Sequence, residues 1–251
     1  MRFTSPILTL LLPGTCGILL HAADPVPPPA VPDTQSKSGV TIFQTVCAQC
    51  HGSNGEGKIE LKTPSIAGNP AWYKNTHLAN IPEGRRGHDA ADPHSFMMAS
   101  IAKALQPEQV KAVVAHVEKM PAVIPTGQNR EMAGVSMDEG MRLFQERCME
   151  CHRYNASGEM TFGSPPLTGL QAWYLEDQLR KFKTGKRGTA KDDINGAKMV
   201  QMTTLFIEDD QMLRDVVAYI MTLNPEPEVA KEPEKKPVEG NPFEGKQTAQ
   251  R

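Results

Sequence analysis

Two short clusters of cysteine and histidine recur in this chain. The first is CAQCH at residues 47–51 and the second is CMECH at residues 148–152. Two cysteines at this spacing can form thioethers with the vinyl groups of a haem, and the adjacent imidazole can bind the iron. The motifs therefore predict two covalently attached haem c groups. The predicted attachment residues are Cys47, Cys50 and His51 in the first motif and Cys148, Cys151 and His152 in the second.

Cysteine pairs separated by two intervening residues also occur in zinc sites and in thioredoxin-like redox centres. In both copies, however, the histidine follows the second cysteine directly, whereas zinc ligands are usually spaced farther apart. The expected mature chain also has no further cysteine to complete a Cys-rich zinc site. These observations favour haem.

The N-terminus has the layout of a secretory signal peptide. Arg2 precedes a mostly apolar run at residues 7–20, and the small residues Ala22 and Ala23 follow. We expect cleavage after residue 23, which removes Cys16 and delivers the protein to the periplasm. Retention of this segment as a membrane anchor is the alternative. No other long apolar segment follows, so no membrane span is expected in the mature chain.

Composition gives broader limits. The 27 basic and 29 acidic residues are interspersed, which argues against nucleic-acid binding. A Pro-rich lead-in at residues 24–38 and a tail at residues 225–251, rich in Pro, Glu and Lys, are predicted to be disordered. What remains suffices for two domains of under 100 residues, for which an enclosed haem would supplement a small apolar core.

The separation of 101 residues between the motifs recurs further along the chain. Proline, glycine, Ala-Trp-Tyr and Arg-Gly positions all repeat at this offset, which indicates tandem copies. The matching positions are Pro64 and Pro165, Gly68 and Gly169, 71–73 and 172–174, Gly84 and Gly185, and 86–87 and 187–188. We expect domains at 39–120 and 136–224, with a linker at 121–135.

Each copy is predicted to be α-helical with long loops. The expected helices are 39–47, 72–78 and 107–120 in the first copy and 137–148, 173–182 and 209–223 in the second. The fold class is therefore all-α.

The ligand on the other side of each iron determines what the haem can do. Among the methionines in the downstream segments, which we expect to be loops, only Met98 and Met199 match at the offset of 101. We therefore predict His/Met ligation, which closes the iron and favours one-electron transfer. Met97 and Met202 are reserves. The histidines of the first copy are the competing candidates, and none is repeated: His77, His88 and His94.

Other repeated residues are candidates for supporting roles. Pro64 and Pro165 each lie 13 residues past the haem histidine, where their carbonyl could accept the imidazole N–H. The tryptophans Trp72 and Trp173 are expected to pack beside the haem or to bind a propionate. Arg86 and Arg187 could pair with propionates, or could lie on a solvated face.

Each copy has a haem motif, then the repeated proline, glycine, Trp-Tyr and Arg-Gly positions, then the predicted ligand methionine and a closing helix. A chain with these features in this order resembles class I cytochromes c, and its tandem form resembles the dihaem cytochrome c4 family. Residues 173–223 are also similar to cytochrome c domains of terminal oxidase subunits. The resemblance covers about residues 39–223 and implies haems that face each other across the domain interface. The chain departs from a strict repeat in having His116 where the second copy has Tyr219, once two extra residues are allowed for.

The expected function is periplasmic electron transfer and not enzymatic catalysis. The resemblance implies a respiratory complex or periplasmic dehydrogenase as donor and a terminal oxidase or reductase as acceptor. One alternative is a permanent dihaem subunit of a dehydrogenase complex, such as a flavoprotein sulfide dehydrogenase. Others are a dihaem peroxidase with one open iron, for which the chain is short, and a gas sensor.

Overall fold

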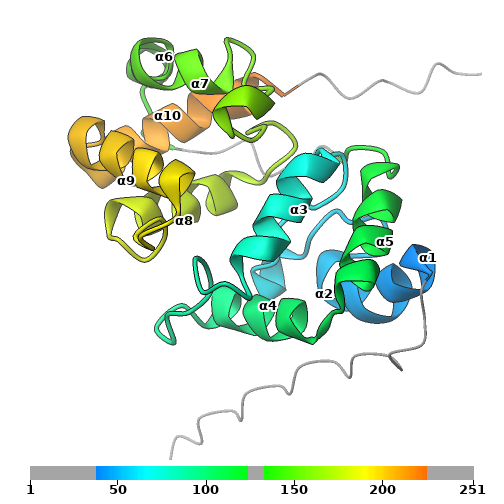
Figure 1. Cartoon of the computed structure of the whole chain (residues 1–251). Helices are drawn as coiled ribbons and strands as arrows, with labels where there is room; N and C mark the ends of the chain where they lie inside the picture. Colours follow the sequence, from blue (N-terminus) through cyan, green and yellow to red (C-terminus); the bar gives the residue numbers. More distant parts are fainter. Residues whose placement is uncertain (1–37, 124–132, 225–251) are drawn as a thin grey trace, which may run out of the picture.

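The computed structural model describes residues 38–123 and 133–224, which form two helical domains beside each other (Figure 1). The expected signal peptide, most of the lead-in, the middle of the linker and the tail lie outside these residues. The first domain contains α1 (Gly39–Ile42), α2 (Ala48–His51), α3 (Ala71–Asn80), α4 (Pro93–Ala104) and α5 (Pro107–Glu118). The second contains α6 (Met137–Leu143), α7 (Met149–His152), α8 (Ala172–Lys183), α9 (Ile194–Phe206) and α10 (Asp210–Thr222). Within the described residues, 38–123 and 133–224, the only β-pairing is one isolated bridge in each domain, so the all-α prediction is confirmed.

The opening helix of each domain leads directly into its cysteine motif. Ser38 caps α1 and Ser136 caps α6 through their side chains, each accepting a hydrogen bond from a first-turn N–H. A π-helical turn then follows in each domain, at Phe43–Cys47 and at Phe144–Cys148. Such widened turns occur frequently at functional sites. Here each ends at the first cysteine of the motif.

The opening and closing helices of each domain cross at a glycine. A Cβ on Gly39 would lie 2.0 Å from the carbonyl oxygen of Ala112 in α5, and one on Gly140 would lie 2.0 Å from that of Asp215 in α10. Only glycine permits so close an approach. The Phe43 ring also contacts His116, as Phe144 contacts Tyr219, so the predicted equivalence of His116 and Tyr219 is confirmed.

The segments that carry the candidate methionines are helices, and the expectation that they are loops was wrong. Asp92 accepts a hydrogen bond from Ser95 N at 3.3 Å and caps α4, where Pro93 occupies the first turn. Asp193 caps α9 in the same way through Gly196 N at 2.8 Å. Neither helix has one clean apolar stripe, because Phe96 in α4 and Leu205 in α9 are exposed, and periodicity therefore missed both.

The two domains contact each other through polar side chains. Lys181 of α8 forms a buried ion pair with Asp92 at 2.8 Å. At the edge of the interface, Arg85 pairs with Asp192 at 2.5 Å. The ammonium of Lys62 lies 5.3 Å from the centre of the Trp173 ring. The helix α8 thus supplies much of the surface that the second domain presents to the first.

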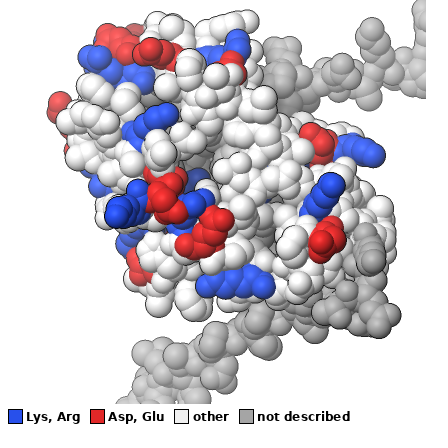
Figure 2. All heavy atoms as spheres, in the orientation of Figure 1, with Lys and Arg blue, Asp and Glu red and all other residues white. Residues whose placement is uncertain are grey.

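On the molecular face in Figure 2, basic and acidic side chains alternate over both domains and form no patch of one sign. This arrangement agrees with the interspersed charges of the sequence. No helix within residues 38–123 or 133–224 is long and apolar enough to cross a membrane.

Candidate haem sites

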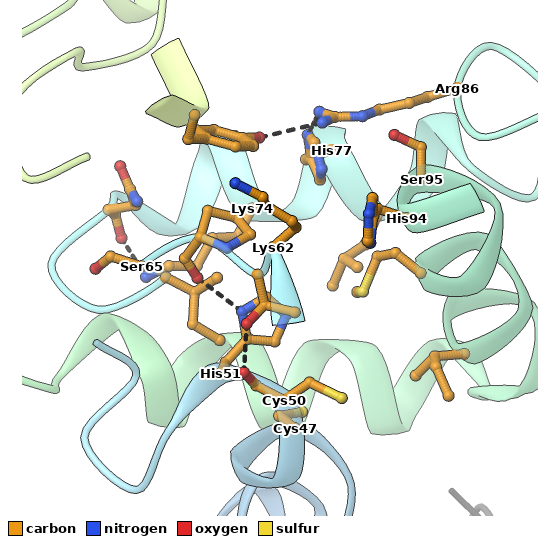
Figure 3. A pocket seen from close by; sticks show the side chains of 18 of the residues that line it. Cys47, Cys50, His51, Lys62, Ser65, Lys74, His77, Arg86, His94 and Ser95 are labelled. Carbon is orange, nitrogen blue, oxygen red and sulfur yellow. Dashed lines mark hydrogen bonds between the residues drawn. The ribbon is translucent and has the colours of Figure 1, made fainter. Parts of the chain in front are cut away.

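The first cysteine motif opens onto a cavity that extends beyond its own domain. This cavity has a volume of about 550 Å³ and a mostly apolar lining, and it reaches across the interface to α8. Figure 3 shows Cys47, Cys50 and His51 on one side of it, with His94 and Ser95 of α4 on the other. The structure thus brings the three predicted attachment residues together at one wall.

The second cysteine motif borders a cavity of about 160 Å³ that lies within its own domain. Cys148, Cys151 and His152 line one wall, and residues of α9 line the other. The construction repeats that of the first domain. A haem in this narrower cavity requires its lining side chains to stand farther apart.

The two haem histidines are held in the same way. His51 Nδ1 lies 2.8 Å from the carbonyl oxygen of Pro64, and His152 Nδ1 lies 2.9 Å from that of Pro165. The prediction for both prolines is confirmed. Since a carbonyl only accepts, Nδ1 carries the proton and Nε2 keeps a lone pair for iron.

Protonation of these groups also fits haem attachment. Burial lowers the pKa of both His51 and His152 against the opposing effect of the proline carbonyls, so the imidazoles are neutral ligands. Burial, with the neighbouring cysteine as a smaller cause, raises the pKa of the free Cys47 thiol to about 11 and that of Cys148 to about 12. A thioredoxin-like nucleophile needs a thiolate, which this environment disfavours.

A zinc site would need donor side chains in addition to the two cysteines and the histidine of each motif. In the part of the chain that the structure describes, no group of three or more His, Cys, Asp or Glu side chains is placed to hold a metal ion. The donor chemistry of both cavities therefore fits a haem, which brings its own four nitrogen ligands and needs one axial imidazole from each motif.

Both methionine candidates of each domain line its cavity: Met97 and Met98 in α4, and Met199 and Met202 in α9. Met98 is partly buried and packs against the cluster of Ile81, Ala99 and Ala102, whereas Met97 is exposed. This difference favours Met98 over its reserve. The assignment of Met98 and Met199 as axial ligands stays a prediction.

The competing histidines have different environments. His77 Nδ1 accepts a hydrogen bond from Arg86 Nη1 at 2.7 Å, because a guanidinium only donates. Burial, followed by the charges of Arg86 and Arg187, holds the pKa of His77 well below its usual value. The proton therefore lies on Nε2, which counts against iron binding. His88 is exposed and lines neither cavity, and His94 lines the first.

A cluster of partly buried polar side chains lies between the domains, where the first cavity meets α8. Arg86 Nη2 donates to Tyr174 Oη at 3.1 Å and to Gln178 Oε1 at 3.0 Å. Arg187 donates to the same Gln178 oxygen at 2.7 Å and lies near the side chain of Tyr73. Burial, with the charge of Arg86 as the next cause, lowers the pKa of Arg187. Neither guanidinium forms an ion pair with a carboxylate of residues 38–123 or 133–224.

Two partly buried guanidiniums with neutral partners suit an anionic ligand. The buried Trp173 Nε1 also has no hydrogen-bond partner within the described residues, and Trp173 lines the first cavity. Arg86 and Trp173 line the first cavity and fit haem propionates there, whereas Arg187 lines neither cavity. The propionate role of both arginines stays a prediction. Trp72 lines neither cavity and instead contacts Tyr73 edge-on.

Sequence reasoning missed the polar partners of this cluster. Tyr73 and Tyr174 repeat at the offset of 101, a signal that could have identified them. Gln178 corresponds to His77 and carried no such signal. Gln171, which bonds the first domain from the start of α8, corresponds to Pro70 and was likewise invisible.

The two sites and the helices around them define a dihaem class I cytochrome c. The chain belongs to the cytochrome c family, whose model matches residues 36–121 and 137–224. Its two covalent haem c groups and its electron-transfer role follow from this membership. The haem supplies an iron that alternates between ferric and ferrous states, and the protein holds and shields it.

Among known proteins, the chain is 30% identical over 167 residues to a thiosulfate dehydrogenase electron acceptor of Stutzerimonas stutzeri, covering 64% of this chain and 74% of the relative. A protein of the same description from Thiomonas intermedia is 29% identical over 196 residues, covering 74% and 81%. The cbb3-type oxidase subunit CcoP of Rhodobacter capsulatus is 31% identical over 140 residues, covering 52% of this chain and 43% of the subunit. The predicted similarity to terminal oxidase subunits is thereby confirmed.

Two solved structures share the fold. Thiosulfate dehydrogenase TsdBA of Marichromatium purpuratum superposes with a TM-score of 0.57 at 25% identity, covering 81% of this chain and 44% of its own. Cytochrome c4 of Acidithiobacillus ferrooxidans gives a TM-score of 0.55 at 21% identity, covering 70% and 98%. The expected resemblance to dihaem cytochromes c4 is therefore confirmed.

Proposed function

We propose that this chain is a periplasmic electron carrier that accepts electrons from a dehydrogenase and delivers them to a terminal oxidase or reductase. A thiosulfate dehydrogenase is the first candidate donor, because two relatives are described as electron acceptors of that enzyme. A respiratory complex is the other candidate donor. Both haems would be ligated by His and Met: His51 with Met98, and His152 with Met199.

The observation that carries this proposal is the position of the first cavity. It is bordered by the haem motif of the first domain and also by Trp173, Tyr174 and Gln178 of the second. A haem held by the first motif therefore lies against the domain that carries the other haem. Such an arrangement supports transfer between the two irons within one chain.

Holding each iron with six ligands in both oxidation states limits the rearrangement that accompanies electron transfer. The chain contributes to this by fixing the imidazole of each motif through a proline carbonyl. The apolar lining of the cavities excludes water from the haem faces. Docking to redox partners is expected to be weak and transient.

The first measurement is the near-infrared spectrum of the oxidised protein, together with its haem content. A methionine sulfur on ferric haem gives a weak charge-transfer band, so its intensity per haem counts Met-ligated irons. Two such irons per chain are expected. One or none would contradict the Met98 and Met199 assignment and favour a peroxidase or a sensor.

The donor is tested by mixing the oxidised protein with thiosulfate and a catalytic amount of a thiosulfate dehydrogenase. The visible spectrum should show both haems becoming reduced. Omission of thiosulfate is the control. A protein that dithionite reduces but this mixture does not would rule out this donor.

A permanent subunit of a dehydrogenase complex is the second candidate function. It is supported by the TsdBA superposition, in which this chain covers less than half of the other chain. Gel filtration of protein from its native host separates the two functions. A stoichiometric partner in the same fraction would contradict a free carrier.

A further inference from the structure

Gln171 of the second domain reaches into the loop of the first domain that orients His51. Gln171 is 2% exposed and occupies the N-cap position directly before α8. Its Oε1 accepts a hydrogen bond from Ser65 N at 3.0 Å, and its Nε2 donates to the carbonyl oxygen of Glu56 at 2.8 Å. Only this orientation of the amide satisfies both backbone groups.

The amide of Ser65 belongs to the same peptide group as the carbonyl that binds His51. Pro64 O accepts from His51 Nδ1 at 2.8 Å on one side of this peptide. Gln171 binds the N–H on its other side. Hydrogen bonds on both ends of a peptide group polarise each other, so an acceptor on the N–H makes the carbonyl oxygen a stronger acceptor.

We propose that Gln171 is a positioning residue of the second domain that lowers the reduction potential of the first haem. A stronger acceptor at Pro64 O draws the proton of His51 Nδ1 and makes Nε2 a stronger donor to iron. Stronger donation stabilises the ferric state relative to the ferrous state. The effect rests on the proposed ligation of the first haem by His51.

The second domain lacks this arrangement. The peptide that follows Pro165 O ends at Pro166, which has no N–H to donate. The residue of the first domain that corresponds to Gln171 is Pro70, which has no side-chain amide. The influence therefore runs in one direction, from the second domain to the first haem.

The packing around Gln171 leaves little space for an alternative. A Cβ on Gly57 would lie 2.7 Å from Gln171 Nε2 and 2.6 Å from the carbonyl carbon of Pro64. Gly57, with φ of +81°, lets the side chain and the peptide group approach each other. Ser65 is itself 2% exposed, so water does not readily replace the glutamine as acceptor.

The main test replaces Gln171 by methionine in the full-length dihaem protein. Gln171→Met keeps the length of the side chain and removes both hydrogen bonds. Spectroelectrochemical titration should show the equilibrium for reduction of the first haem shifting about threefold toward the ferrous state, a rise of about 30 mV. The second haem should keep its potential, and Ser65 N should exchange its hydrogen faster.

Two substitutions at one position provide the matched control. Ser65→Pro removes the N–H, as Pro166 does in the second repeat, and should raise the first potential as Gln171→Met does. Ser65→Ala keeps the N–H, loses only the hydroxyl bond to the Gly55 carbonyl, and should leave the potential near that of the wild type. Equal shifts for both variants would contradict the proposal.

Asp192→Asn is the control for a general loosening of the domain interface. It removes the ion pair with Arg85 and leaves the hydrogen bonds of the Ser65 peptide in place. This variant should leave the first potential unchanged. A Gln171→Met variant with an exposed Ser65 amide and an unchanged first potential would overturn the inference, as would equal shifts of both haems. The wild-type spectrum tests ligation separately: a first haem that lacks an axial histidine contradicts the proposed function itself.

Discussion

The two domains follow the same plan, yet the first is more polar beside its haem site. Lys74 of α3 is buried in the first cavity, where the second domain has the buried Leu175. His77 similarly corresponds to Gln178. In the described residues, the apolar core of the second domain is one cluster, whereas that of the first is divided into two. The first domain thus depends more on its haem and on its neighbour.

The strongest test of this difference removes each haem in turn. Cys47→Ala with Cys50→Ala should leave one haem per chain, measured by mass spectrometry, and should abolish much of the helical circular dichroism of the first domain. Its divided core buries too little apolar surface without the ring. The matched pair Cys148→Ala and Cys151→Ala should cost less helix, since that core is continuous. Equal losses would remove the distinction.

The next largest effect concerns the axial ligands. Met98→Ala should halve the near-infrared charge-transfer band and lower the potential of the first haem, because a thioether ligand raises it. Met97→Ala, a change to the adjacent exposed residue of α4, should leave the band intact. The reverse result would assign the ligand to Met97. Met199→Ala and Met202→Ala make the same test in the second domain.

Lys74→Leu introduces the residue of the second repeat and should stabilise the first domain. Burial lowers the pKa of Lys74 to about 8, against the opposing charge of Glu118. The unfolded chain, with its ordinary value of 10.5, binds more protons between these pH values, so the wild type should gain stability as pH rises through this window. Below pH 8 the variant should be more stable by about 1–2 kcal/mol, reduced for solvent screening.

Thermal unfolding of the wild type and the Lys74→Leu variant from pH 7 to 10.5 checks this expectation. The gap between the two proteins should narrow as pH rises. A constant gap would show that the ammonium remains charged when folded.

The smallest expected effect is in the backbone after each motif. Arg153 has φ of +65° and ψ of +160°, a region that strongly favours glycine, and the corresponding residue of the first domain is Gly52. Arg153→Gly should raise the free energy of unfolding by about 1 kcal/mol, since the exposed ion pair with Glu159 contributes little. Gly52→Ala should lower it by a similar amount. Denaturant titration measures both free energies of unfolding. An unchanged free energy of unfolding for Gly52→Ala would contradict the argument from backbone strain.

Much of this architecture was predictable from local patterns. The motifs, the offset of 101 and the apolar spacing indicated two haem domains, and the opening and closing helices lie where expected. The helices α4 and α9 were missed because their apolar residues surround the helix, although Asp92 before Pro93 was an available start signal. The contacts between the domains could not be predicted from the sequence. Gln171 and Gln178 correspond to unlike residues of the first copy, Pro70 and His77, so the repeat does not identify them.

The close approach of Gly39 to Ala112 affects when the first domain can fold during synthesis of the chain. The two ends of the first domain meet, so its fold can close once α5, which ends at Glu118, has been made. Its haem surroundings are incomplete at that stage, because Gln171, Trp173 and Gln178 belong to chain not yet synthesised. The first haem therefore acquires its final environment only when the second half of the protein has emerged and docked.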